Sequence, residues 1–395
     1  MAIHKIFNDP VYGFIRIPTG IILEIIEHPY FQRLQRIRQL GLTHFVYPGA
    51  VHTRFHHALG AFHLMTTALN VLREKGVHIT SEEYEASQLA ILLHDIGHGP
   101  FSHVLEHTLV PIHHEAITLM IMEQLNLEFE GQLTLAITIF KGQYHKQFLH
   151  QLISSQLDVD RLDYLTRDSF YTGVAEGVIG YDRLLLMIDV VDQQLVIEEK
   201  AIYSIEKFLT SRKIMYWQVY MHKTCIAAEF MLQQFLTLMN KDNHYDGLSS
   251  GLKYFLSSNK HNQILDHREL LLKHFNQIDD IDIWFFLKKQ ATLNLGLISE
   301  LAYGLIFRKL YKIQLHNEIF ETSNNPESYE KFDSEINVNR DSGTIRFIAY
   351  NKEEGEIMIK TKSGNVKKLS EVYDVSHLSN WSKKYYKILP YKIHF

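Results

Sequence analysis

Residues 94–103 read His-Asp-Ile-Gly-His-Gly-Pro-Phe-Ser-His, and this stretch decides how the chain is interpreted. It follows an apolar run at residues 89–93 that predicts the end of a buried helix. An Asp side chain is seldom buried unless it is paired or bound to a metal. His94 and Asp95 could therefore both reach one cation. Taken alone, the dipeptide favours a plainer interpretation, a helix-terminal pair with surface hydrogen bonds.

The residues around this dipeptide favour a cation site instead. His98 lies one turn after His94 and shares its face, and the Gly-Pro step that follows allows a tight reversal toward the same place. Asp160, Tyr164 and Asp168 follow an i, i+4, i+8 spacing along one stripe of a predicted helix. Nitrogen and hard oxygen ligands together suit Mn, Fe, Mg, Zn or Ni.

Two further carboxylates lie beside this stripe. Asp158 and Asp163 are expected to cap the helix or to pair with Arg161 and Arg167 rather than to bind a metal. Carboxylate density alone therefore does not define the ligand set.

The composition narrows the class of protein. The chain has 395 residues with a net charge of −5, which provides no global basic field for nucleic acid. Of its 24 His, twelve lie between His44 and His114. Cys225 is the single cysteine, which excludes an intrachain disulfide and fits a reducing, cytoplasmic compartment. The sequence shows no signal-peptide pattern and no apolar run of membrane-spanning length.

The fold class expected from periodicity and from the 20 Gly and 8 Pro is mainly α. A helical domain is expected over residues 1–312 and a small α+β region over residues 313–395. Residues 1–20 look turn-rich, residues 193–199 resemble a strand, and residues 344–349 and 356–360 are expected to form a hairpin. Helices are expected near residues 21–40, 55–75, 114–126, 131–140, 147–156, 158–169, 181–189, 203–240, 263–275 and 281–309. A further helix is expected to follow a cap at residues 80–83 and to stop at residues 97–100.

The ordered set His57, His94-Asp95 and Asp160 resembles the signature of HD-domain metal-dependent phosphohydrolases. Over roughly residues 4–225 the chain is similar to one branch, the deoxynucleoside triphosphate (dNTP) triphosphohydrolases, which share the HD core of SAM-and-HD-domain proteins. The matching motifs are KIFNDPVYG at 5–13, FQRL at 31–34, QLG at 39–41, YPGA at 47–50, HTRF at 52–55, LG at 59–60 and HDIGHGPFSH at 94–103.

The resemblance implies that these four residues bind a divalent ion, which is Mn, Fe, Mg, Ni or Zn. It also implies hydrolysis of dNTPs to deoxynucleoside and triphosphate, by attack of a metal-activated water at the α-phosphorus. The resemblance assigns phosphate chemistry and protonation of the leaving group to His98, His103, Glu106 and His114. Glu106 stands where relatives usually have Asp. His56 and His113, which neighbour motif histidines, receive no role.

Substrate-binding positions also follow from the resemblance. Arg54 matches a phosphate-binding Arg, Gln39 and Leu40 match the pair beside the deoxyribose, and Tyr164 and Asp168 match the sugar pocket.

A later set matches a substrate-binding helix. Arg212, Tyr216, Tyr220 and Lys223 follow i, i+4, i+8, i+11 spacing, which predicts one helical face with two cations and two phenols. Tyr216 stands where His is common and Met221 where Gln is common, so the nucleobase preference stays open.

The resemblance also bears on activation by nucleotides and on the oligomeric state. Relatives gated by guanine nucleotides use an Asp, Gln and Arg where this chain has Glu27, Gln32 and Gln35, and a later Arg aligns with Glu198. Strict nucleotide activation is therefore not expected. The resemblance implies a homo-oligomer, a dimer or a tetramer. Two other functions remain open: an HD phosphohydrolase for another nucleotide or phosphoester, and a nucleotide-binding regulatory module.

Overall fold

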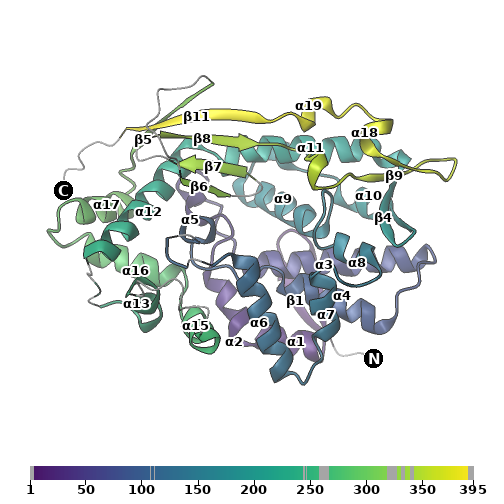
Figure 1. Ribbon diagram of the computed structural model, residues 1–395, viewed down its shortest axis with the longest axis horizontal. Helices are drawn as coiled ribbons and strands as arrows, with labels where there is room; N and C mark the ends of the chain where they lie inside the picture. The colour runs from purple at the N-terminus through teal and green to yellow at the C-terminus, as the bar shows by residue number, and fades with distance from the viewer. Residues whose placement is uncertain are drawn as a thin grey trace.

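The computed structural model describes residues 4–106, 108–110, 112–242, 245, 247–257, 267–317, 327–330, 334–338 and 342–389. Within these ranges the fold is mainly α, as predicted (Figure 1). The helices are α1 (Ile21–Glu27), α2 (Pro29–Gln32), α3 (Arg54–Glu74), α4 (Ser81–Leu93), α5 (Ser102–Leu105), α6 (His114–Glu128), α7 (Thr134–Phe140), α8 (Gln147–Gln151), α9 (Val159–Thr172), α10 (Tyr181–Leu186), α11 (Ile202–Met215), α12 (Lys223–Asp242), α13 (Ser250–Ser257), α15 (Arg268–Phe275), α16 (Asp280–Gln290), α17 (Leu297–Ile306), α18 (Leu369–Val372) and α19 (Ser376–Ser379). No described helix is both long and apolar enough to cross a membrane.

Three sheets accompany the helices. A hairpin of β1 (His4–Asp9) and β2 (Gly13–Pro18) opens the chain, where only turns were expected. The second sheet has the order β10-β9-β4-β3, and the third has the order β5-β11-β8-β7-β6. Their strands are β3 (Ile188–Val191), β4 (Gln194–Glu198), β5 (Lys312–His316), β6 (Glu327–Glu330), β7 (Ser334–Val338), β8 (Ser342–Phe347), β9 (Met358–Lys360), β10 (Val366–Lys368) and β11 (Ser382–Leu389).

The predicted strand at residues 193–199 is confirmed as β4, whereas the predicted C-terminal hairpin is wrong. Residues 344–349 overlap β8, which pairs with β7 and β11, and residues 356–360 overlap β9, which pairs with β4 and β10. The connection between them is folded rather than a tight turn, because Tyr350 is fully buried and its hydroxyl accepts the Ile357 backbone N–H.

Two long helices predicted from periodicity are each divided in the structure. The stretch at residues 203–240 is interrupted by a π-helical segment, Tyr216–Tyr220, before α12 begins at Lys223. The stretch at residues 281–309 divides into α16 and α17, where Gly296 adopts a positive φ of 61°. The predicted helix at residues 263–275 begins outside the described residues, and its described part is α15.

The C-terminal region packs closely on the helical region. β9 pairs in parallel with β4, and the Tyr216 ring stacks on Phe347 with centroids 3.7 Å apart. One hydrophobic cluster runs through both regions, and Figure 1 shows β8 and β11 along one edge beside α11. The division at residues 312 and 313, which falls at the start of β5, stays a prediction about independent folding units.

Candidate metal and phosphate site

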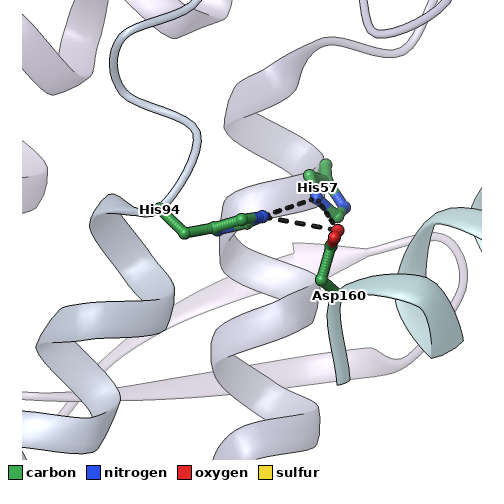
Figure 2. A group of neighbouring side chains, drawn as sticks. All are labelled: His57, His94 and Asp160. Carbon is green, nitrogen blue, oxygen red and sulfur yellow. Dashed lines mark hydrogen bonds and ion pairs between the residues drawn. The ribbon is translucent and has the colours of Figure 1, made fainter. Parts of the chain in front are cut away.

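Three helices bring His57, His94 and Asp160 together (Figure 2). His57 projects from α3, His94 caps the C-terminus of α4, and Asp160 lies in the first turn of α9. Asp160 Oδ1 is 3.0 Å from His57 Nε2 and 3.4 Å from His94 Nε2, and the two nitrogens are 3.3 Å apart. The Asp158 side chain fixes this turn of α9, since it caps the helix by accepting the Arg161 backbone N–H.

Hydrogen bonds on the far side of each imidazole orient both rings. His57 Nδ1 lies 2.7 Å from Asp163 Oδ2, and His94 Nδ1 lies 2.6 Å from the Ile91 carbonyl oxygen. With Nδ1 donating in each ring, both Nε2 atoms face the Asp160 carboxylate, where a metal ion would take the place of a proton. Metal-binding His residues are commonly held this way. Two imidazole nitrogens and one carboxylate oxygen therefore fit a divalent transition metal.

The electrostatics favour positive charge at this point. Burial lowers the pKa of His57, but hydrogen bonds to Asp160 and Asp163 prevail and raise it to about 10. Burial raises the pKa of Asp160, yet hydrogen bonds from His57 and His94 hold it well below its usual value. The attraction that retains a proton between these groups also attracts a metal cation.

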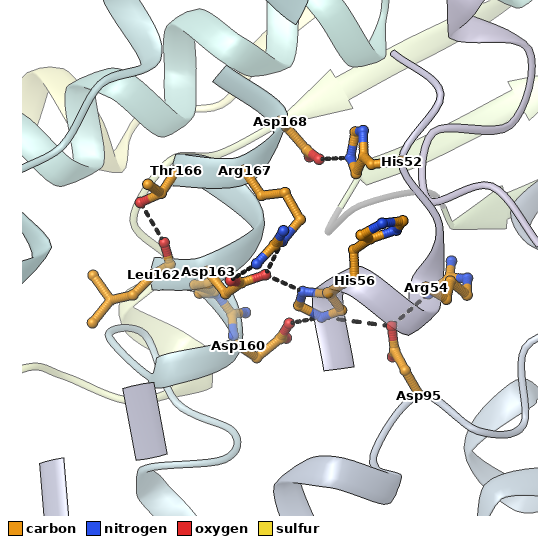
Figure 3. A network of polar contacts seen from close by, with 12 residues as sticks. His52, Arg54, His56, Asp95, Asp160, Leu162, Asp163, Thr166, Arg167 and Asp168 are labelled. Atoms are coloured by element: carbon orange, nitrogen blue, oxygen red, sulfur yellow. Dashed lines mark hydrogen bonds and ion pairs between the residues drawn. The ribbon is translucent and has the colours of Figure 1, made fainter. Parts of the chain in front are cut away.

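Asp95 lies beside this group and pairs with Arg54 (Figure 3). Its Oδ2 accepts from Arg54 Nη1 at 2.5 Å, and its Oδ1 is 3.2 Å from His98 Nε2. The nearest ligand candidates are more distant, with His94 Nε2 at 3.5 Å and His57 Nε2 at 3.7 Å. Asp95 thus faces the candidate metal position while it holds Arg54 in place.

A buried ion-pair chain lies behind His57. Arg167 donates to both oxygens of Asp163 at 3.0 Å (Figure 3). It also donates to Asp9 Oδ2 at 2.8 Å. Gly60 lies against this pair, because a Cβ at that position would collide with the Asp163 carboxylate. The sequence had indicated the pairing of Asp163 with Arg167, but it gave no sign of the contact with His57.

The candidate proton-transfer residues form a second cluster. Glu106 Oε1 accepts the His114 backbone N–H at 2.8 Å and lies 3.0 Å from His114 Nδ1. The His114 ring stacks on His98 with centroids 3.9 Å apart. Burial, Arg54 and His114 lower the pKa of His98, which keeps it neutral. The side chain of His103 lies outside the described residues.

Asp168, a candidate sugar-pocket residue, has two buried partners. Its Oδ1 lies 2.7 Å from His52 Nε2, and its Oδ2 accepts from the Tyr220 hydroxyl at 2.8 Å. Tyr164 is buried on the same helix, with its ring 6.4 Å from that of Tyr220. Sequence reasoning missed His52, although it stands in the motif at residues 52–55.

Several polar atoms around these residues are buried without a hydrogen-bond partner among the described residues. They are Gln39 Oε1, His52 Nδ1 and Arg54 Nε. Unpaired buried polar atoms are uncommon in folded proteins and require an explanation. A polar ligand in contact with residues 39–54 would supply the missing hydrogen-bond partners. Leu40, the neighbour of Gln39, is buried in the core.

The prediction of one continuous helical face after α11 is wrong. Because the π-helical segment intervenes, Arg212, Tyr216, Tyr220 and Lys223 do not follow a single α-helical stripe. Tyr220 reaches Asp168, but Arg212 donates to the Ala349 carbonyl oxygen at 2.8 Å, and Lys223 is exposed at the start of α12. The structure therefore brings Tyr220 to Asp168 and directs Arg212 toward the C-terminal region.

Comparisons with known proteins agree with this geometry. The HD domain family matches residues 54–168, and the HD associated region matches residues 179–248. A crystal structure of a phosphohydrolase from Bacteroides thetaiotaomicron is 45% identical, with a TM-score of 0.89 over 98% of this chain and 100% of that one. The uncharacterized protein YwfO of Bacillus subtilis is 32% identical, over 78% of this chain and 71% of the relative. A Dictyostelium discoideum protein named deoxynucleoside triphosphate triphosphohydrolase SAMHD1 homolog is 30% identical, over 59% of this chain and 49% of its own length.

This chain belongs to the HD-domain phosphohydrolase family, as its motifs predicted, and it resembles SAM-and-HD-domain proteins. It is therefore a hydrolase by family. HD domains bind divalent metals, and the His57, His94 and Asp160 group could hold one. The roles of the individual residues stay predictions.

Proposed function

We propose that this chain hydrolyses dNTPs to deoxynucleoside and inorganic triphosphate. The observation that carries the proposal is the convergence of His57, His94 and Asp160, with Arg54 held beside them by Asp95. The similarity to the named Dictyostelium discoideum relative supports the substrate class. A buried Arg beside a cation position suits a polyphosphate, which brings several negative charges to one place.

His57, His94, Asp95 and Asp160 would hold the metal ion. When bound, a divalent ion supplies Lewis-acid polarisation of a phosphoryl oxygen and lowers the pKa of water toward about 7. The protein contributes orientation, because Asp163 fixes His57 and the Ile91 carbonyl fixes His94. Arg54 would bind a phosphate oxygen through guanidinium N–H groups that Asp95 does not occupy.

His114 is the proposed proton donor. In the proposed reaction, water attacks the α-phosphorus and releases a proton to solvent, and the bond from the α-phosphorus to the 5′ oxygen breaks. His114 gives its proton to that oxygen as the deoxynucleoside leaves, and a proton from solvent then restores His114. Glu106 would stabilise the protonated ring through Nδ1. General-acid catalysis of this kind typically contributes about 10²- to 10⁴-fold. His103 and His98 are proposed to contact the phosphates.

The sugar would bind near Asp168. Gln39 and Tyr164 are proposed as its neighbours, and the unpaired Gln39 Oε1 could accept a hydrogen bond from a sugar hydroxyl. Tyr220 and His52 would then act by holding the Asp168 carboxylate in position. Leu40, Arg212, Tyr216 and Lys223 are assigned to the substrate by the resemblance alone, and the contacts of Arg212 and Lys223 do not add support to that assignment.

Strict activation by a guanine nucleotide is not part of the proposal. Glu27 pairs with Lys5 at 2.7 Å, and Glu198 pairs with Lys75 at 2.6 Å and Lys200 at 2.7 Å. Glu198 would repel a nucleotide phosphate where relatives carry an Arg, and Gln35 lacks the charge of the other Arg of the relatives. A homo-oligomer is proposed from the resemblance.

A panel of dNTPs and NTPs, with Mn²⁺, Mg²⁺ or Fe²⁺ and with or without GTP, tests the function. The proposal expects inorganic triphosphate in amounts equal to the deoxynucleoside. Release of orthophosphate or pyrophosphate alone would instead indicate another HD phosphohydrolase. Tight nucleotide binding without turnover would indicate a regulatory module.

A further inference from the structure

A second group of potential metal ligands lies close to the first. Glu106, His113 and His114 each offer one ligand atom, and these atoms lie within 4.8 Å of one another. Two imidazole nitrogens with one carboxylate oxygen form the ligand set of zinc sites that keep an open position. His113 has no part in the proposed reaction, so its place in this group needs its own explanation.

The distances in this group already approach those of a metal site. Zn²⁺ bonds of about 2.0–2.1 Å in tetrahedral geometry place ligand atoms roughly 3.3 Å apart. Glu106 Oε1 lies 3.0 Å from His114 Nδ1 and 3.7 Å from His113 Nε2, which brackets that spacing. Glu106 is also fixed by the His114 backbone N–H. Small side-chain rotations would therefore complete the arrangement.

The surroundings give this group an entry path and a link to the first site. The His113 side chain is 49% exposed, whereas that of Glu106 is 7% exposed, so an ion could enter from solvent and meet a buried carboxylate. The His114 ring stacks on His98, which bonds Asp95. An ion at the second group would thus immobilise a ring that packs directly on the candidate active site.

We propose that Glu106, His113 and His114 form a second Zn²⁺ site, weaker than the first, whose occupation inhibits hydrolysis. The inhibitory part rests on the proposed function, because an ion on His114 Nδ1 prevents that ring from becoming an imidazolium that donates a proton. The binding part does not depend on it.

The difference in affinity follows from how the imidazoles are held. The far nitrogens of His57 and His94 have close hydrogen-bond partners, whereas His113 Nδ1 lies 4.0 Å from the exposed Glu115 carboxylate. Loss of such outer partners typically costs 10- to 100-fold in metal affinity. We therefore expect the second site to fill about 10- to 100-fold later in a Zn²⁺ titration.

Metal counting on the full chain tests the binding part. Chelator-treated protein is dialysed against Zn²⁺, and bound zinc is measured by mass spectrometry, without nucleotide. We expect two ions per chain for the unsubstituted protein and one for His113→Ala. The control His145→Ala removes an exposed His elsewhere and should keep two. One ion in the unsubstituted protein, or two in His113→Ala, overturns the site.

Inhibition is measured on the Mn²⁺-loaded protein with added Zn²⁺. His113→Ala should retain basal turnover, and its half-inhibitory Zn²⁺ concentration should rise about tenfold or more. An unchanged half-inhibitory concentration would overturn the inhibitory part, since inhibition would then arise at the first site. If no dNTP is hydrolysed, the proposed function fails while the zinc counts still decide whether the second site exists.

Discussion

Gly60 is the position where one added methyl group should weaken metal binding without changing any ligand. A Cβ at residue 60 would lie 2.7 Å from Asp163 Cγ and closer still to Asp163 Oδ1 and Arg167 Nη2. An ordinary contact begins near 3.4 Å, so the carboxylate must shift by at least 0.7 Å (3.4 minus 2.7). The 2.7 Å contact with His57 Nδ1 would then stretch to about 3.4 Å, near the limit of a hydrogen bond.

The expected loss in Gly60→Ala follows from that shift. Displacing the outer partner of a metal-binding His typically costs 10- to 100-fold in affinity, and overpacking a core costs about 1–3 kcal/mol of stability. Helix propensity acts the other way, because Ala is favoured over Gly by about 1 kcal/mol inside a helix. The free energy of unfolding of the metal-free protein should therefore fall rather than rise.

Two measurements check this reasoning. Competition with a chelating indicator gives the metal affinity, and urea unfolding without metal gives the stability. Gly180→Ala is the matched control, because a Cβ there meets nothing within 4 Å, and it should bind metal like the unsubstituted chain. If Gly60→Ala binds metal normally and is more stable, the contact between Asp163 and His57 does not control the site.

Other predictions concern residues around the site. His94→Ala should abolish both metal retention, measured by mass spectrometry, and turnover; full activity after metal depletion would exclude the metal mechanism. His52→Ala removes a partner worth about 1.5–3 kcal/mol from the Asp168 carboxylate, so the KM for a dNTP should rise while metal affinity stays unchanged. Burial raises the pKa of Asp280 to about 7, because its effect exceeds that of the backbone hydrogen bonds that lower it. The Asp280 carboxyl group therefore holds its proton more tightly in the folded state than in the unfolded state. Its contribution to stability should decline as pH rises from about 4 to about 7. Asp280→Asn should lack that decline in urea unfolding, and an identical pH profile would contradict the assignment.

The helix positions of the candidate ligands could be predicted because their signal is local. His94 ends an apolar helix, and Asp160 belongs to a stripe with a regular spacing, so periodicity places both on helix faces. That they meet His57 came from the resemblance, since spacing alone does not bring α3, α4 and α9 together.

The errors arose where tertiary contacts override local pattern. Residues 203–240 carry continuous helical periodicity, yet the π-helical segment at Tyr216–Tyr220 divides them. Such segments often occur at functional sites, and here Tyr220 reaches Asp168. The strand run at residues 344–349 was recognised, but its partner β11 lies far along the chain, and no local turn signal specifies that pairing.

The side chains that hold the loop after Asp95 could not be predicted from the sequence for a different reason. They bind backbone atoms of the loop rather than its side chains. Arg33 is fully buried and donates to the carbonyl oxygens of Ile96 and His98 at 2.9 and 2.8 Å. Asp280 Oδ1 accepts the N–H of Phe101, a residue held at a positive φ of 47°. Almost every residue type supplies a backbone carbonyl and an N–H, so the sequence at residues 96, 98 and 101 does not indicate these contacts. The position of His98 beside Asp95 therefore depends on side chains from α16 and from the segment after α2, and local motifs specify only the ligands themselves.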